Sequence, residues 1–335
     1  MKKAIILFNL GGPDKIENVE PFLFNLFNDP AILNLPTIIR YPLAKLISNR
    51  RAPVAKKIYE ELGGSSPILK LTREQSDALE RKINKDQTKD EYKCFIVMRC
   101  WNPRAKDVIK DVQLFNPEEI ILMPLYPQYS AATSGSSIKE WKDVCKKNNY
   151  KVKTSTICCY PTDQNFINAH TKEILKKIKD LKNFKLIFSA HGLPEKNIKR
   201  GDPYQWQVEQ SVKKIVENLN IENLDWILSY QSRVGPLKWI GPSTDNIIIE
   251  NSKIGKHIVL VPIAFVSEHS ETLVELDIEY KELADANGCK NYTRVPALGT
   301  NENFIKAMSE LIIKKDAYKI NEGLYPPKIQ CPSNF

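Results

Sequence analysis

One segment of the chain places a histidine directly after a run of apolar residues. The run Leu186-Ile187-Phe188 predicts a buried parallel strand, and His191 follows it just before a Gly-Leu-Pro turn. Ligands bind at the carboxyl ends of strands in open parallel sheets, so this position would present the imidazole to a ligand. A histidine at a strand end can equally serve as a structural hydrogen-bonding residue, and the segment alone leaves both interpretations open.

A second predicted strand also ends in titratable residues. The stretch 262–271 begins with an apolar run and continues into Glu268 and His269. The sequence therefore has two strand ends that carry groups able to bind a cation or to transfer a proton.

The helix predicted over 272–283 carries a row of carboxylates. Glu271, Glu275 and Glu279 recur at every fourth residue, and this spacing drifts by only about 40° around a helix axis per step. Such a row is commonly a solvated face with lysine partners, but Lys281 is the only nearby basic residue on this helix. The row is therefore more typical of a path for a cation or for protons than of a charged face that only contacts solvent.

Composition and charge limit the class of protein. The chain has 335 residues, 42% hydrophobic and 27% charged, which suits a globular enzyme of two domains. The net charge of +9 is spread over lysine-rich segments without a recognised nucleic-acid-binding motif. We expect no nucleic acid as a partner, and a modest attraction to acidic ligands or anionic membranes.

The order of apolar runs predicts an α/β fold. Helical or loop-rich segments separate most of the runs, which argues for parallel sheets covered on both faces. We expect two similarly built domains, 1–160 and 161–320, each with a four-stranded parallel sheet flanked by helices, and an active-site cleft between them. The sequence lacks the nucleotide-binding fingerprints of such folds. The predicted strands are 3–8, 94–98, 119–124, 152–158, 185–189, 226–230, 257–266 and 291–295.

The segment 19–67 interrupts the alternation of strands and helices. It is rich in Phe, Leu and Ile, and it is either a satellite core or an apolar lip over the cleft. A lip could grip a flat hydrophobic ligand or rest on a membrane surface, with Arg50 and Arg51 available to meet carboxylates. Prolines should divide the segment into short helices or turns. These prolines are Pro30, Pro36, Pro42 and Pro53.

The N-terminus and the cysteines indicate a cytoplasmic protein. The apolar run in residues 1–8 is too short for a signal peptide and predicts a first strand, and no apolar stretch approaches the length of a spanning helix. Seven cysteines include no C-x-x-C, which favours a reducing compartment.

Seven motifs in sequence order resemble those of ferrochelatases, and the resemblance runs from about residue 3 to about residue 315. It implies two Rossmann-like domains that bind no nucleotide. It also implies insertion of Fe²⁺, as a substrate, into a porphyrin, most simply protoporphyrin IX, to give heme with release of two protons. The motifs are Leu7-Phe8-Asn9-Leu10-Gly11-Gly12-Pro13-Asp14, Gly63-Gly64-Ser65-Ser66-Pro67-Ile68, Leu125-Tyr126-Pro127-Gln128-Tyr129-Ser130, Ser189-Ala190-His191-Gly192-Leu193-Pro194, Ser229-Tyr230-Gln231-Ser232-Arg233-Val234-Gly235-Pro236, Trp239-Ile240-Gly241-Pro242 and the block 265–280.

The resemblance assigns roles to the titratable residues. His191 and Glu271 match the family's catalytic pair at the metal and proton site, with the division of labour between them left open. Glu275 and Glu279 continue an acidic path, and Glu268 and His269 order the residues around the site. Arg51, Tyr59 and Ser66 match positions that contact porphyrin propionates or the ring edge. Residues expected to line the porphyrin cavity are Leu10, Met98, Arg99 and Trp239.

The chain departs from the members that carry an iron–sulfur cluster. Its tail, 321–335, supplies only Cys331, and Ala169 stands where those members have an earlier ligand. We therefore expect no iron–sulfur cluster, no permanently bound cofactor and a monomer. The C-terminal helix of the second domain is expected to pack back on the first.

Other functions remain open at this stage. A chelatase for another tetrapyrrole or metal would keep the histidine and the acidic helix. A heme or porphyrin carrier would bind without turnover, and a binding protein for another small ligand would share only the fold. The choice between protoporphyrin and coproporphyrin depends on pocket shape, which this sequence does not reveal. The apolar lip predicts peripheral attachment to anionic membranes.

Overall fold

The structure is a computed structural model that describes residues 1–86, 89–233, 235 and 237–315. The chain forms two compact units. Unit 1 comprises residues 1–159 with the described residues 308–315, and unit 2 comprises residues 160–307.

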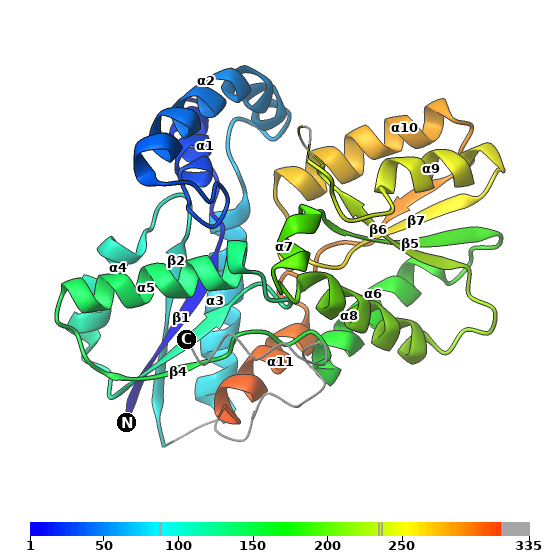
Figure 1. Cartoon of the computed structure of the whole chain (residues 1–335). Coiled ribbons are helices and arrows are strands. Elements are labelled where there is room, and N and C mark those ends of the chain that lie inside the picture. The colour runs from blue at the N-terminus through cyan, green and yellow to red at the C-terminus, as the bar shows by residue number, and fades with distance from the viewer. Residues whose placement is uncertain (87–88, 234, 236, 316–335) are drawn as a thin grey trace. The chain divides into compact units, whose positions relative to one another are not determined.

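Unit 1 is built on a four-stranded parallel sheet with the strand order β2-β1-β3-β4 (Figure 1). The inner position of β1 explains its composition, because Ala4–Phe8 are fully buried and a central parallel strand is covered on both faces. The strands of this sheet are β1 (Lys2–Asn9), β2 (Glu91–Met98), β3 (Glu119–Pro124) and β4 (Lys153–Thr156).

Helices α4 and α5 supply the core on one face of this sheet. The apolar stripe of α4, including Val108 and Val112, packs with β1 residues such as Ile6 and with Trp141 of α5. Unit 1 also contains a short 3₁₀ turn η1 and a π-helical turn η2. Its helical elements begin with η1 (Ile16–Asn18), α1 (Val19–Phe27), α2 (Thr37–Glu61) and α3 (Ile68–Asp86), and continue with α4 (Ala105–Phe115), η2 (Ala131–Gly135) and α5 (Ser136–Lys147).

The expectation that prolines divide residues 19–67 into short pieces was wrong for its second half. Helix α2 continues for 25 residues with Pro42 and Pro53 inside it. Proline removes a backbone donor, so the carbonyls four residues earlier, at Ile38 and Asn49, lose their helical partner. Both of these residues are exposed, and water can satisfy their carbonyls.

Unit 2 repeats the topology of unit 1. Its four parallel strands have the order β6-β5-β7-β8, the same arrangement of first, second, third and fourth strand (Figure 1). The fold class inferred from the sequence is thus confirmed as two four-stranded parallel sheets with flanking helices. The strands are β5 (Phe184–His191), β6 (Trp226–Gln231), β7 (His257–Pro262) and β8 (Tyr292–Arg294).

One face of this sheet packs against α9, η3 and α10. Ile187 of β5 and Leu260 of β7 share a buried cluster with Ile248 of α9, Leu276 of η3 and Ala284 of α10. This packing fixes η3 against the sheet. The helical elements of unit 2 are α6 (Gln164–Ile178), α7 (Glu195–Lys199), α8 (Tyr204–Leu219), α9 (Thr244–Lys253), η3 (Glu271–Glu279) and α10 (Tyr280–Ala286).

The acidic helix differs from the regular α-helix that the spacing predicts. Its first part, η3, is a π-helix, and only the residues from Tyr280 onward are α-helical. The amide of Tyr280 accordingly donates to the carbonyl of Glu275, five residues earlier. π-Helical turns are often found at functional sites, because the extra residue per turn changes where side chains point.

Helix α11 (Glu302–Ile313) joins the two units in sequence, since its first residues belong to unit 2 and those from Met308 onward to unit 1. Just after it, Lys315 lies 3.2 Å from the buried carboxylate of Glu119 on β3. Within the described ranges, no helix combines the length and the apolar character needed to cross a membrane.

Candidate active site

The strand β5 ends at His191, and the adjacent strand β6 ends at its register partner Gln231. The turn that follows His191 lies tightly against β6. The amide of Gly192 donates to the Gln231 carbonyl at 2.9 Å, and a Cβ on Gly192 would lie 2.9 Å from that oxygen and 3.2 Å from the ring of Trp239. Glycine is required here by close approach, and the turn fixes the position of the imidazole.

Trp239 lies beside this turn. Trp239 forms an antiparallel bridge with Pro194, and the amide of Ile240 donates to the carbonyl of Leu193 at 3.0 Å. The sequence-predicted Trp239 is therefore placed next to the histidine within unit 2.

The central contact of the site joins His191 to Glu271, the first residue of η3. Nδ1 of His191 lies 2.9 Å from Oε2 of Glu271. Burial opposes protonation of the ring, but the adjacent carboxylate outweighs this effect and raises the pKa of His191. Burial likewise disfavours an ionised Glu271, but the positive charge of His191 holds the pKa of Glu271 below its ordinary value. The carboxylate therefore stabilises the protonated ring, which makes His191 a stronger base than burial alone would allow.

Glu275, one turn along η3, is held by donors from two elements. The amide of Ser232 donates to Oε1 at 3.0 Å, and its hydroxyl donates to Oε2 at 2.6 Å. Gln231 Nε2 lies 3.3 Å from Oε2, and the hydroxyl of Tyr280 lies 3.2 Å from Oε1. Burial, followed by the negative charge of Glu271, nevertheless raises the pKa of Glu275 to about 7.

His269 and Glu268 adjoin this group, as the sequence predicts, but each has a different role. Nε2 of His269 lies 3.9 Å from Glu271, and burial lowers the pKa of His269 and favours a neutral ring. Glu268 accepts from Arg294 at 2.9 Å, and Arg294 also binds Asp277 of η3 through two nitrogens at 2.6 and 2.7 Å. This ion network ties the end of β8 to the loop that leads into the π-helix and to the π-helix itself.

Glu279 is the one member of the acidic row that does not join the others. Its side chain is exposed, whereas Glu271 and Glu275 both lie beside Ser232. The π-helical backbone departs from the α-helical geometry on which the predicted single stripe rested.

The remaining porphyrin-contact predictions fall in unit 1. Met98, at the carboxyl end of β2, is fully buried, and Tyr59 lies in a buried cluster formed by α1, α2 and Cys100. Leu10 packs at the edge of that cluster, and Ser66 lies against Gly12, where an added Cβ would come within 2.5 Å of it. Of these four residues, Met98 ends β2 and Leu10 directly follows β1, so both lie at the carboxyl ends of strands in the first sheet.

The two arginines of this set differ in their surroundings. Arg99 is nearly buried and binds Asp29 at 2.8 Å and the hydroxyl of Ser136 at 2.6 Å, so its charge is already paired. Arg51 is exposed on α2, with its guanidinium 5.8 Å from the ring centre of Phe27. Arg51 therefore matches a carboxylate-binding role better than Arg99 does.

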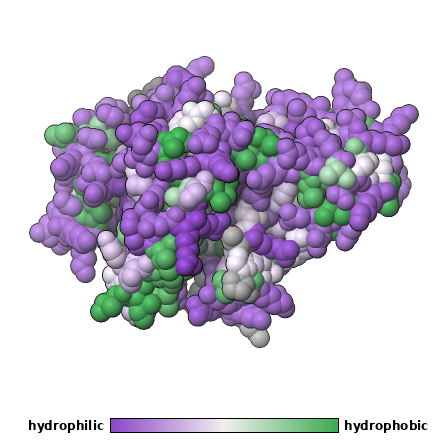
Figure 2. All heavy atoms as spheres, turned by 90° about the horizontal axis from the view of Figure 1, so that it is seen from above, coloured by the Kyte–Doolittle hydropathy of each residue, from purple (hydrophilic) through white to green (hydrophobic). Residues whose placement is uncertain are grey.

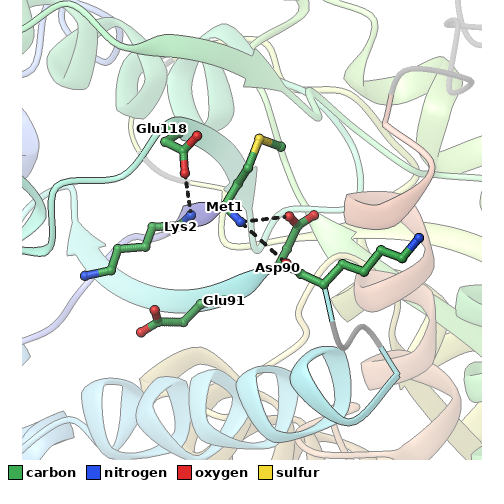
Figure 3. A pocket seen from close by; sticks show the side chains of 6 residues that line it. Met1, Lys2, Asp90, Glu91 and Glu118 are labelled. Atoms are coloured by element: carbon green, nitrogen blue, oxygen red, sulfur yellow. Dashed lines mark hydrogen bonds and ion pairs between the residues drawn. The ribbon is translucent and has the colours of Figure 1, made fainter.

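A polar hollow of about 350 Å³ lies elsewhere in unit 1, at the amino ends of β1 and β2 (Figure 3). The amino group of Met1 pairs with Asp90 at 3.3 Å, and the backbone amide of Lys2 donates to Glu118 at 3.2 Å. Ligands in parallel sheets bind at the opposite, carboxyl ends. We do not assign this hollow to the reaction.

Sequence reasoning missed Ser232 and Gln231 as site residues, although both fall in a motif that carried the family resemblance. A usable signal was present, since the polar pair follows the predicted strand 226–230 as His191 follows its own strand. Cys331 and the tail, on which the prediction of no cluster depends, lie outside the described residues.

Comparison with known proteins decides the family. The family model for ferrochelatase matches residues 2–316. The chain belongs to the ferrochelatase family. A ferrochelatase of Pelagibacter ubique (strain HTCC1062) is 90% identical over 335 residues, covering 100% of this chain and 97% of the relative. A ferrochelatase of Rickettsia bellii (strain OSU 85-389) is 50% identical over 311 residues, covering 93% of this chain and 86% of the relative.

Solved structures agree on the fold alone. SirB from Bacillus subtilis with Fe³⁺ matches with a TM-score of 0.56 at 12% identity, covering 95% of this chain and 96% of SirB. The sirohydrochlorin chelatase SirB of Bacillus subtilis subspecies spizizenii with cobalt matches with a TM-score of 0.55 at 10% identity, covering 94% and 95%. Membership of the ferrochelatase family makes this chain a porphyrin metal chelatase that inserts Fe²⁺ during heme synthesis.

Proposed function

We propose that His191 and Glu271 form the catalytic pair of this reaction, and that His191 accepts protons from the porphyrin. Metallation displaces two pyrrole N–H protons, so it needs a base close to the ring. In the tautomer in which Nδ1–H donates to Glu271, the lone pair of Nε2 is left to accept a proton. The adjacent carboxylate then stabilises the imidazolium that forms.

The observation that carries this proposal is the 2.9 Å contact between His191 and Glu271 at the carboxyl end of β5. The imidazole is 37% exposed and the carboxylate 27%, so a substrate can reach the pair. Nitrogen and carboxylate oxygen are also suitable ligands for Fe²⁺, and either residue could hold the incoming iron before it enters the ring.

The test is anaerobic metallation of protoporphyrin by the whole chain, followed through the absorbance change of the porphyrin. We expect turnover, with faster turnover of protoporphyrin than of coproporphyrin. Binding of porphyrin without turnover would favour a heme or porphyrin carrier instead. A faster reaction with coproporphyrin would overturn the proposed choice of substrate but not the reaction.

We further propose that α2 contacts anionic membranes peripherally, and that the enzyme is a cytoplasmic monomer without an iron–sulfur cluster. Ile38 is 88% exposed on α2 and Val54 is 66% exposed. The basic residues Lys45, Arg50 and Arg51 are exposed on the same helix. Exposed apolar side chains among basic ones suit the interface of an anionic bilayer. Figure 2 shows, from above, a surface on which hydrophobic patches interrupt mostly hydrophilic residues.

The porphyrin contacts of Leu10, Arg51, Tyr59, Ser66, Met98, Arg99 and Trp239 stay predictions. These predictions are supported only by where the residues lie in the fold. Met98 ends a strand of the first sheet, Trp239 lies beside the catalytic turn, and Arg51 offers an exposed guanidinium for a propionate. Bidentate pairing with carboxylates is the chemistry for which arginine is best suited.

A further inference from the structure

A serine hydroxyl lies between two of the carboxylates of the π-helix, those of Glu271 and Glu275. Oγ of Ser232 is 2.6 Å from Oε2 of Glu275 and 3.4 Å from Oε2 of Glu271. No direct hydrogen bond joins the two carboxylates among the described contacts. The side chain of a residue outside the helix therefore contacts both carboxylates.

The backbone holds Ser232 in this position. Ser232 directly follows the last residue of β6 and has a φ of 60°, a left-handed conformation that is uncommon for residues other than glycine. This conformation directs the amide of Ser232 as well as its hydroxyl to Glu275. Strained conformations of this kind persist where the surrounding structure requires them, often at functional sites.

The neighbouring Gln231 reinforces the arrangement. Its Oε1 accepts from the hydroxyl of Ser189 on β5 at 2.7 Å, which fixes the side-chain amide. Its Nε2 then lies 3.3 Å from Glu275 and 3.5 Å from the Ser232 hydroxyl. Gln231 is fully buried, so the polar group beside the serine has a single orientation.

We propose that the hydroxyl of Ser232 relays protons from Glu271 to Glu275, and so connects the His191 pair to the rest of the acidic helix. This inference rests on the proposed catalytic pair. A proton bound to Oε2 of Glu271 passes to Oγ of Ser232 while the hydroxyl proton of Ser232 passes to Oε2 of Glu275. Glu271 returns to a carboxylate, Glu275 becomes the acid, and the serine is neutral before and after. Rotation of the hydroxyl resets the relay.

The relay explains how two protons per turnover could leave a partly buried site. The serine hydroxyl lies within hydrogen-bonding distance of both carboxylates, so it can donate to Glu275 while it accepts from a protonated Glu271. The predicted path along the helix thus depends on the residue that follows β6.

The experiment compares Ser232→Ala with wild type in anaerobic metallation of protoporphyrin. We expect kcat to fall by about 10²-fold, because a positioned group that transfers protons contributes at least that much to the rate. KM for porphyrin should change little, and the solvent deuterium isotope effect on kcat should increase. Ser232→Cys, which keeps a proton-bearing group, should recover part of kcat. The matched control is Ser229→Ala on the same strand, since the Ser229 hydroxyl bonds to the Phe188 carbonyl and Thr244 instead.

A double-mutant cycle with Glu275→Gln separates a relay from a structural role. If both residues serve one route, Ser232→Ala/Glu275→Gln should be no slower than the slower single variant. Losses that multiply, or a folded Ser232→Ala enzyme with normal kcat, would overturn the relay. If Ser232→Ala does not fold, Ser232→Gly replaces it, because glycine adopts the same backbone conformation without a hydroxyl. Absence of turnover in wild type would instead refute the proposed function.

Discussion

The imidazole of His191 lies 2.9 Å from the carboxylate of Glu271, although 80 residues separate them in the sequence. His191 ends β5, and Glu271 begins the π-helix that follows β7, the strand next to β5 in the sheet. Parallel pairing of β5 with β7 brings both residues to the same edge. The contact is therefore a direct product of the strand order.

Removing either member of this pair should abolish most activity. We expect His191→Ala and Glu271→Gln each to lower kcat for metallation by about 10²- to 10⁴-fold, because a positioned base or its stabilising partner is lost. Absorbance assays under anaerobic conditions measure the effect. His257→Gln is the control, since His257 starts β7 at the opposite end and bonds Thr293. Near-normal kcat in both site variants would exclude the pair as catalytic groups.

Glu275 should make stability fall as the pH rises. Its folded-state pKa of about 7 lies above the ordinary value of 4.5, so between these values the folded chain holds a proton that the unfolded chain has released. This contribution to stability is fully present below the lower value and is lost as the pH rises through the upper one. Glu275→Gln should therefore lose less stability than wild type between about pH 5 and about pH 8.

Chemical denaturation at several pH values measures this difference. Glu279→Gln removes one negative charge from the same helix at an exposed position and serves as the matched control. If the free energy of unfolding of wild type and of Glu275→Gln depended on pH in the same way, the pKa of Glu275 would not be raised in the folded protein.

Gly192→Ala should damage both stability and catalysis. The new Cβ would lie 2.9 Å from the Gln231 carbonyl, so the end of β6 must shift. Overpacking of this kind costs about 1–3 kcal/mol in the free energy of unfolding. Since Gln231 precedes Ser232, we also expect a lower kcat.

Thermal unfolding and metallation assays test this effect together. At Gly241 an added Cβ meets nothing nearer than 3.9 Å, so Gly241→Ala is the control. Equal stability of the two variants would contradict the close packing at the turn.

An acidic residue on the exposed face of α2 should weaken membrane binding. Ile38→Asp removes an 88% exposed apolar side chain and adds a negative charge. We expect less co-sedimentation with phosphatidylserine-containing vesicles, and we expect salt to weaken binding of the wild type. Leu114→Asp changes a residue of α4 that is similarly exposed, at 83%, and should bind vesicles as wild type does. Equal losses in both variants would argue against a specific role for α2.

Much of the site could be predicted because its strands are short apolar runs that end in polar residues. The run before His191 and the run before Glu268 identify two strand ends, and the parallel fold requires that such ends share an edge. The π-helix could not be predicted, because Glu271, Glu275 and Glu279 fit a regular α-helix equally well in sequence. The continuation of α2 through Pro42 could not be predicted either, because proline usually ends a helix. Here the carbonyl that loses its helical partner lies on an exposed face, where water can bind it instead.

By itself, the sequence determined the α/β class and the duplicated strand arrangement, and it pointed to the histidine and glutamate that we propose as the catalytic pair, because buried parallel strands require continuous apolar runs and leave polar residues at their ends. Only the tertiary structure decided that Ser232 lies between Glu271 and Glu275 while Glu279 faces solvent. That arrangement depends on a left-handed residue at the end of β6 and on the pitch of a neighbouring helix. Neither leaves a periodic pattern in the chain, because each is set by contacts between elements far apart in sequence.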